Sequence, residues 1–216
     1  MENQSDQVKT KDVQIKKEET WSDVFRFVAL TLLIIIPIRM FIIEPYMVRG
    51  ESMLPNFENN DYLLTEKLSV WKNIPNYNRG DILIFKSPVE QKRTLIKRII
   101  GLPGETIKII DGVTMIAKNN DAQGEPIFEN LNEPYINSVD DGSFDINLIQ
   151  LKQSSFNIEP ITLKADEFFV MGDNRLASYD SRFWGPLPAE NIIGRPIIRL
   201  FQFDKIGIWP ARFLTE

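Results

Sequence analysis

The chain contains no cysteine and no histidine. Without cysteine it can form neither a disulfide nor a thiolate metal site, and it has no cysteine nucleophile. Without histidine it lacks the usual base of serine hydrolases, and a zinc site would have to be built from carboxylates alone. We therefore expect no metal and no cofactor. Any serine nucleophile must give its proton to a lysine or a carboxylate.

An excess of positive charge is also missing. The 216 residues carry a net charge of -5, and no basic arm is present. Sequence-independent binding to nucleic acid depends on clustered lysine and arginine, so we expect no nucleic-acid partner. The hydrophobic share of 43% is ordinary for a folded protein. This length is sufficient for one substantial domain, or for a core domain that carries an insertion.

The sequence has one long apolar run, at 27–43. Arg39 is the single charged residue in this run. A run of about 17 to 25 residues can span a membrane. We expect a solvated cytoplasmic tail at 1–23 and an uncleaved transmembrane anchor at 24–43, because the lysines before the run favour a cytoplasmic N-terminus. The alternatives are a cleaved secretory peptide and a buried core helix. Glu44 and Pro45 follow the run, where a secretory peptide would have small residues.

Beyond residue 44, short apolar segments rich in β-branched and aromatic residues alternate with turn signals. The pattern predicts strands at 81–85, 94–100, 106–110, 113–117, 167–171 and 197–203. Asp111-Gly112 predicts a hairpin between two of them. The expected fold is mainly β, a partly closed antiparallel sheet. We assign 44–108 and 166–216 to this catalytic core and 109–165 to an inserted, weakly structured lobe, because 118–165 is polar.

Two residues of this chain are candidates for a serine hydrolase without histidine. Ser52 lies in Gly-Glu-Ser-Met-Leu-Pro at 50–55, directly after the apolar run. Lys97 lies in the predicted strand 94–100, where alternation places it on one face with Leu95 and Ile99. A free lysine has a pKa of about 10.4, and full burial can lower it by about 3 to 5, into the range of a base. The alternative is that neither residue is catalytic, since most lysines are solvated and most serines lie in surface turns.

A third polar block follows the predicted strand 167–171 and ends at Pro188. In this block, the hydroxyl of Ser178 can donate a hydrogen bond to the base or accept one from it. Asp180 and Arg182 can hold the loop in place. By itself this block is equally consistent with a tight loop that is fixed by its own ion pair.

Taken together, four blocks resemble, in order, those of the bacterial type I signal peptidases. They are 50–55, Arg-Gly-Asp-Ile-Leu-Ile-Phe at 79–85, Lys-Arg-Ile-Ile-Gly-Leu-Pro-Gly-Glu at 97–105, and 172–186. These enzymes are membrane-bound Ser-Lys endopeptidases that remove leader peptides from exported proteins. Relatives in the endoplasmic reticulum carry histidine in place of the lysine, so the resemblance is to the bacterial and organellar branch.

The resemblance implies roles for individual residues. Ser52 is expected to be the nucleophile and Lys97 the general base, with Ser178, Asp180 and Arg182 supporting them. The Ser52 backbone N–H is expected to donate to the oxyanion. Some members have a second, serine donor two residues before the nucleophile, where this chain has Gly50, so the second donor stays open.

The resemblance also implies a substrate and a location. The expected partners are preproteins that carry signal peptides and the lipid bilayer, with the catalytic part at the outer face of the cell membrane. A substrate would lie extended as an added strand, with small side chains in shallow apolar pockets. The expected pocket walls are Val48, Met53, Leu95 and Ile96. Two other functions remain open: a self-cleaving Ser-Lys peptidase of the SOS-repressor kind, and an inactive membrane-tethered β domain that only binds export substrates.

Overall fold

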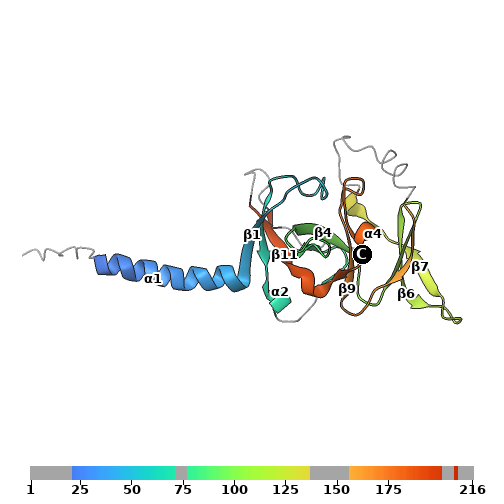
Figure 1. Cartoon of the computed structure of the whole chain (residues 1–216), viewed down its shortest axis with the longest axis horizontal. Helices are drawn as coiled ribbons and strands as arrows, with labels where there is room; N and C mark the ends of the chain where they lie inside the picture. Colours follow the sequence, from blue (N-terminus) through green and yellow to red (C-terminus); the bar gives the residue numbers. More distant parts are fainter. Residues whose placement is uncertain (1–20, 72–76, 137–155, 201–206, 209–216) are drawn as a thin grey trace, which may run out of the picture. The chain divides into compact units, whose positions relative to one another are not determined.

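In the computed structural model, residues 21–71, 77–136, 156–200 and 207–208 are described. The chain divides into two compact units, Met1–Ile38 and Arg39–Glu216 (Figure 1). Most of the expected tail at 1–23 lies outside the described residues.

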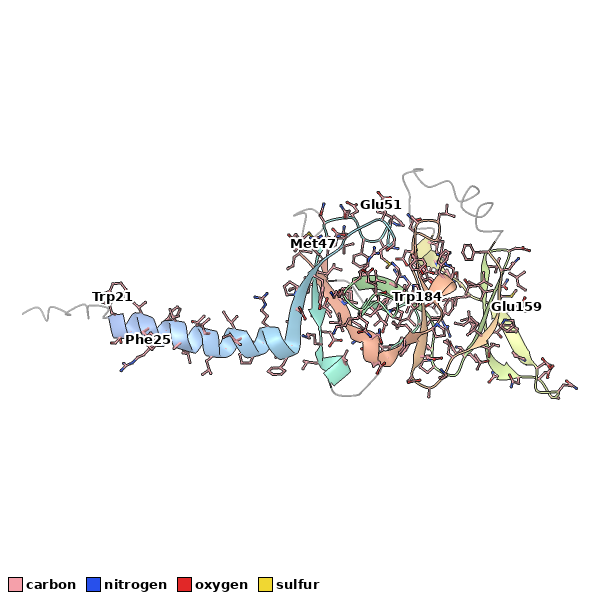
Figure 2. The ribbon with its side chains drawn as sticks, viewed as in Figure 1. Trp21, Phe25, Met47, Glu51, Glu159 and Trp184 are labelled. Carbon is pink, nitrogen blue, oxygen red and sulfur yellow. The ribbon has the colours of Figure 1, made fainter. Side chains whose placement is uncertain are left out.

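The first unit contains one apolar helix, α1 (Trp21–Pro37), none of whose side chains is buried. Trp21 and Phe25 project from it (Figure 2), with exposed fractions of 89% and 74%. α1 ends at Pro37, which cannot donate a backbone hydrogen bond, and the short π-helix η1 (Ile38–Ile42) follows it in sequence. Across the described ranges, no helix is both long enough and apolar enough to cross a membrane. The anchor expected at 24–43 stays a prediction.

An antiparallel sheet forms the main part of the second unit. Among the described residues it has eight strands, in the order β1-β2-β11-β3-β4-β9-β10, with β12 paired to β11. Their bounds are β1 Ile43–Met47, β2 Tyr62–Glu66, β3 Ile82–Lys86, β4 Thr94–Gly101, β9 Glu167–Met171, β10 Leu187–Pro188, β11 Ile192–Arg199 and β12 Gly207–Ile208. Three short helical segments connect strands: α2 (Leu68–Trp71), α4 (Ser181–Trp184) and η3 (Ala189–Asn191).

A second antiparallel sheet contains four strands in the described part of the chain, in the order β7-β6-β5-β8. They are β5 Thr106–Ile110, β6 Val113–Asn120, β7 Pro126–Asn130 and β8 Ile158–Thr162. Asp111 and Gly112 form the β5–β6 turn with φ of 49° and 76°, as a type I′ hairpin requires. The expected lobe therefore contains regular strands, and a 3-10 turn, η2 (Pro134–Ile136), follows β7. Residues 137–155 lie outside the described ranges.

The structure confirms the mainly β, antiparallel fold, and five of the six predicted strands occur within a few residues of their expected bounds. The sixth, expected at 197–203, is wrong at its start, because β11 begins at Ile192 and contains Pro196. Proline breaks a strand pattern, and here it lies next to a bulge opposite β2. Residues 201–203 of that prediction are not among the described residues. Proline also masks β1, β7 and β8, which the sequence pattern does not predict.

Alternating residues of β3 pack on two different core clusters. Leu83 and Phe85 belong to one cluster, whereas Ile82 and Ile84 belong to another. Both faces of β3 are therefore buried, which explains why its sequence is continuously apolar.

A third cluster joins the two sheets. It includes Ile100 of β4 and Phe169 of β9 from the main sheet, packed with Ile107 and Ile109 of β5. The second sheet thus shares a core with the strand that carries Lys97.

Candidate active site

Ser52 and Lys97 meet although 45 residues separate them. Ser52 lies in the turn that follows β1, and Lys97 lies in the middle of β4. Lys97 Nζ donates a hydrogen bond of 2.6 Å to Ser52 Oγ. Lys97 is only 3% exposed, and Ser52 is half-buried. The contact is short enough for direct proton transfer between the two groups.

Burial also changes the acidity of the lysine. It lowers the pKa of Lys97 from its usual value to about 8. The nearby carboxylates of Asp180 and Asp173 act in the opposite direction, while Arg93 and Arg182 lower the pKa further. Because the pKa lies close to neutral pH, a useful fraction of Lys97 is unprotonated there and can accept a proton.

The neighbouring residue Arg98 fixes this part of β4. Its guanidinium donates to both carboxylate oxygens of Asp173 at 2.7 and 2.6 Å, and to the backbone oxygen of Gly80 at 2.7 Å. The ion pair is buried, with side-chain exposures of 1% and 0%. A paired, fully hydrogen-bonded charge of this kind has a defined geometry, so it attaches β4 firmly to the loop that follows β9.

That loop contacts Ser52 directly. The backbone N–H of Asn174 donates to the Ser52 backbone oxygen at 3.1 Å. A Cβ added to Gly172 would lie 2.4 Å from the same oxygen and 2.3 Å from Ser178 Oγ. Only glycine allows this approach at position 172. Sequence reasoning did not single out Gly172, although a glycine directly after a strand is a signal of close backbone approach.

Asp180 and Arg182 hold the loop together. Asp180 Oδ2 accepts from the Gly172 N–H at 3.0 Å, and its carboxylate receives the Arg182 side chain at 2.8 and 2.9 Å. Asp180 also caps α4. Arg182 donates in addition to the backbone oxygen of Arg175 at 2.8 Å. The two residues thus join both ends of the loop 172–182.

Ser178 does not make the hydrogen bond to the lysine that we expect from the sequence. Its Oγ is buried and has no hydrogen-bond partner in the described part of the chain. Lys97 Nζ is directed at Ser52 Oγ instead. Ser178 Oγ therefore lies beside Gly172 as an unsatisfied group near Ser52.

A cleft of about 600 Å³ opens beside the two residues and is lined by Ser52 and Lys97 themselves. Of the expected pocket walls, Val48, Leu95 and Ile96 line this cleft. Met53 corrects the expectation: it is 1% exposed and packs in the core with Phe57, because the turn directs the residue after Ser52 inward.

The second oxyanion donor stays open in the structure. The Gly50 N–H donates to Asn59 Oδ1 at 3.0 Å. Gly50 has φ of +94°, and there is open space where its Cβ would lie. In the described ranges, no group of three or more acidic side chains could hold a metal ion.

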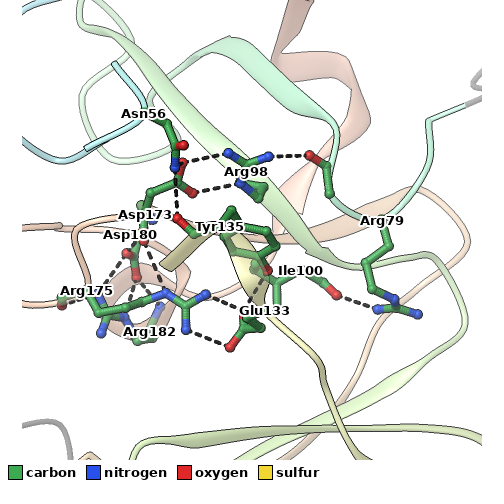
Figure 3. A network of polar contacts seen from close by, with 12 residues as sticks. Asn56, Arg79, Arg98, Ile100, Glu133, Tyr135, Asp173, Arg175, Asp180 and Arg182 are labelled. Carbon is green, nitrogen blue, oxygen red and sulfur yellow. Dashed lines mark hydrogen bonds and ion pairs between the residues drawn. The ribbon is translucent and has the colours of Figure 1, made fainter. Parts of the chain in front are cut away.

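Further polar residues surround the site, and the sequence pattern did not reveal them (Figure 3). Asn56 donates to Asp173 Oδ2 at 2.8 Å and to the Tyr135 backbone oxygen at 2.9 Å. Glu133 accepts from the Arg175 guanidinium. Tyr135 and Glu133 belong to a stretch that we read as part of a polar lobe, and no local signal connects them to residues 40 to 80 positions away.

A serine beside a buried lysine of lowered pKa, at the wall of a cleft, is the arrangement of serine hydrolases that work without histidine. Comparison of the sequence identifies the family. Residues 21–201 match the model of the family "Signal peptidase, peptidase S26", and the chain belongs to this family.

The matches to two curated relatives cover most of this chain and most of each relative. Signal peptidase I of Leptolyngbya laminosa is 35% identical over 201 residues, which is 90% of this chain and 86% of that protein. Signal peptidase I P of Bacillus subtilis subsp. natto is 33% identical over 201 residues, which is 90% of this chain and 97% of that protein. A crystal structure of a signal peptidase I from Enterococcus faecalis V583 is 29% identical, covers 56% of this chain and 97% of that chain, and has a TM-score of 0.38.

Proposed function

We propose that this chain is a membrane-bound signal peptidase I, a serine endopeptidase that cleaves N-terminal signal peptides from exported preproteins. The observation that carries the proposal is the 2.6 Å contact between Lys97 Nζ and Ser52 Oγ at the wall of the cleft. Membership of the signal peptidase family and the names of the relatives supply the substrate class.

In the proposed reaction one base serves both half-reactions. Neutral Lys97 takes the proton of the Ser52 hydroxyl as the oxygen attacks the scissile carbonyl, and then gives it to the leaving amine. Lys97 next removes a proton from the water that hydrolyses the acyl enzyme. The Ser52 backbone N–H donates to the oxyanion. Asp180 and Arg182 keep the loop 172–182 in place, and Ser178 lies in this loop beside Gly172.

The substrate binds in the cleft as an extended strand. The pairing of β4 with β9 begins at Arg98, and residues 94–97, before this pairing, line the cleft. The side chains of Val48, Leu95 and Ile96 form apolar walls, which suit the small residues that precede a signal-peptide cleavage site. Main-chain pairing supplies affinity in this binding mode, and the pockets supply specificity.

Cleavage of a preprotein by the purified full-length chain in detergent tests this function. We expect one cut after the signal peptide, located by mass spectrometry of both products. As the matched control substrate, a preprotein with a bulky residue immediately before the cut should be processed much more slowly, because the apolar pockets are shallow. A serine-directed acylating reagent should label Ser52, identified by peptide mapping.

Each alternative function has a different outcome in the same experiment. Loss of mass from the chain itself, with the preprotein intact, would indicate a self-cleaving peptidase. Binding of the preprotein with neither cleavage nor labelling of Ser52 would indicate an inactive binding domain. Either result would contradict the proposed function.

The location proposed is the cell membrane, with the N-terminus in the cytoplasm and the site at the outer face. Support comes from the apolar run at 27–43 and from the exposure of the apolar side chains on α1, which water solvates poorly. We expect the full chain to remain in the pellet when membranes are extracted at alkaline pH. Replacing Leu32, Leu33 and Ile34 together by aspartate should release it. Release of the unaltered chain would contradict the anchor.

A further inference from the structure

The segment 131–136, which follows β7 in the expected lobe, contacts the loop beside Ser52 (Figure 3). Both guanidinium ends of Arg175 donate to the Glu133 carboxylate, with the Nη1 contact at 2.9 Å. The Tyr135 hydroxyl donates to the same carboxylate at 2.7 Å. The side chains of Arg175 and Glu133 are only 3% and 10% exposed. A bidentate, largely buried pair of this kind defines position and orientation as well as distance.

From Glu133 a chain of contacts leads to the nucleophile. Arg175 Nε donates to the backbone oxygen of Gly172 at 3.1 Å. Gly172 lies against the Ser52 backbone oxygen so closely that no Cβ would fit. Glu133 thus fixes Arg175, Arg175 fixes Gly172, and Gly172 borders Ser52.

A second chain of contacts leads from the same segment to the base. The Tyr135 ring lies under the Arg98 guanidinium, 4.2 Å from its carbon to the ring centroid. Arg98 is the residue next to Lys97 on β4. The Tyr135 backbone oxygen also accepts from Asn56, which lies four residues after Ser52. The segment 131–136 therefore contacts the supports of both reacting residues.

The carboxylate of Glu133 and the guanidinium of Arg175 are both charged at neutral pH. Burial by itself would raise the pKa of Glu133, but the Arg175 guanidinium outweighs it, and the pKa of Glu133 is lowered. Glu133 also contributes to a raised pKa of Arg175. The pair consists of two ions, and removing either one leaves a buried charge without its partner.

We propose that Glu133 is a positioning residue for the cleavage reaction, acting through Arg175 on Gly172 and Ser52, so that the lobe between the two parts of the catalytic core completes the active site. This inference rests on the proposed function. It assigns to the lobe a positioning role in catalysis, in contrast to a lobe that contributes only to the stability of the fold.

The test compares Glu133→Gln with the unaltered chain in detergent. Glutamine keeps the size and one acceptor but removes the charge. We expect kcat per active molecule to fall at least about tenfold with KM within about twofold, because misplacing reacting groups affects the chemical step. Active molecules are counted by complete labelling with a serine-directed reagent, so a smaller folded fraction does not imitate the effect. The rate constant for labelling of Ser52 should fall in parallel.

Glu66→Gln is the matched control. Glu66 forms a partly buried ion pair with Arg195 at 3.3 Å between β2 and β11, and neither strand contains a residue of the loop 172–182. Its replacement should lower the urea midpoint but leave kcat per labelled molecule unchanged. If Glu133→Gln does not fold, Glu133→Asp and Tyr135→Phe replace it, and a slower Ser52 labelling rate is expected in both.

The outcomes separate the inference from the function on which it rests. Normal kcat and a normal labelling rate in Glu133→Gln, in a chain that cleaves preproteins, would overturn the inference alone. A slower labelling rate in a chain that cleaves no preprotein would support the positioning role and overturn the proposed substrate. Failure of the unaltered chain to be labelled at Ser52 would overturn both.

Discussion

Replacing Lys97 by methionine is expected to lower kcat/KM on a preprotein by about 10⁴-fold or more, because a nucleophile and its base act as a unit. Methionine keeps the length and apolar stem of lysine but cannot accept a proton. The measurement is the initial cleavage rate per folded molecule, with Ser52→Ala as the background.

The same replacement is expected to stabilise the protein. The pKa of Lys97 is about 8 when folded and returns to its usual value of 10.5 on unfolding. Below pH 8 the lysine is charged in both states, and burial of that charge costs roughly 3 kcal/mol at about 1.4 kcal/mol per pH unit. Between pH 8 and 10.5 the unfolded state binds more protons, so stability rises with pH and the cost disappears. Urea unfolding at pH 7 should show a gain of up to about 3 kcal/mol for Lys97→Met, and less at pH 10.

The pH dependence of the unaltered enzyme provides a second measurement of the same group. Only neutral Lys97 can act as the base, so kcat/KM should rise about tenfold per pH unit below pH 8 and level off above it. Lys86→Met is the control, since Lys86 is exposed at the end of β3. It should change neither kcat/KM nor stability by more than about 0.5 kcal/mol. A flat pH profile, or substantial cleavage by Lys97→Met, would show that another group removes the proton.

Local pattern was sufficient to predict the strands that carry the chemistry. In β4 the β-branched residues predict the strand, and the alternation of side chains places Lys97 on one face with Leu95 and Ile99, which pack in one cluster. Proline concealed β1 and β8, since Pro45 and Pro160 interrupt the pattern that identifies a strand.

The meeting of Ser52 and Lys97 could not be predicted from spacing. Their contact depends on the order β1-β2-β11-β3-β4, in which four pairings lie between the strand before Ser52 and the strand that contains Lys97. It was expected only because the surrounding blocks resemble a known family. Met53 shows the same limit, because the direction of one side chain in a turn is set by packing with Phe57 and not by its neighbours in sequence.

The network behind the site was the least predictable part. Glu133 and Arg175 are 42 residues apart, and Asn56 and Tyr135 are 79 apart. Each residue lies in a polar stretch where charged and amide side chains are usually solvated. Their burial follows from the packing of the second sheet against β4 and β9.

Gly172→Ala is expected to lower kcat/KM by about 10²-fold, since displacement of a reacting group by about 1 Å is sufficient for such a loss. The new methyl group would lie 2.4 Å from the Ser52 backbone oxygen. Ser178 can turn its hydroxyl away, but its Cβ, 2.6 Å from the new methyl group, and the carbonyl of Ser52 can move only with their backbones. Overpacking of this kind should also cost about 1 to 3 kcal/mol of stability.

Gly194→Ala separates misplacement of Ser52 from loss of stability. A Cβ at Gly194 would meet the Glu66 backbone oxygen at 1.9 Å, a backbone clash between β11 and β2. It should lower the urea midpoint at least as much as Gly172→Ala while preserving kcat/KM per molecule labelled at Ser52. Adding Ser178→Gly to Gly172→Ala removes the clashes with Ser178 Oγ and Cβ and leaves the clash with the Ser52 carbonyl. Activity should therefore stay low in the double variant, and its recovery would show that Gly172 is required to make room for Ser178 rather than to place the nucleophile.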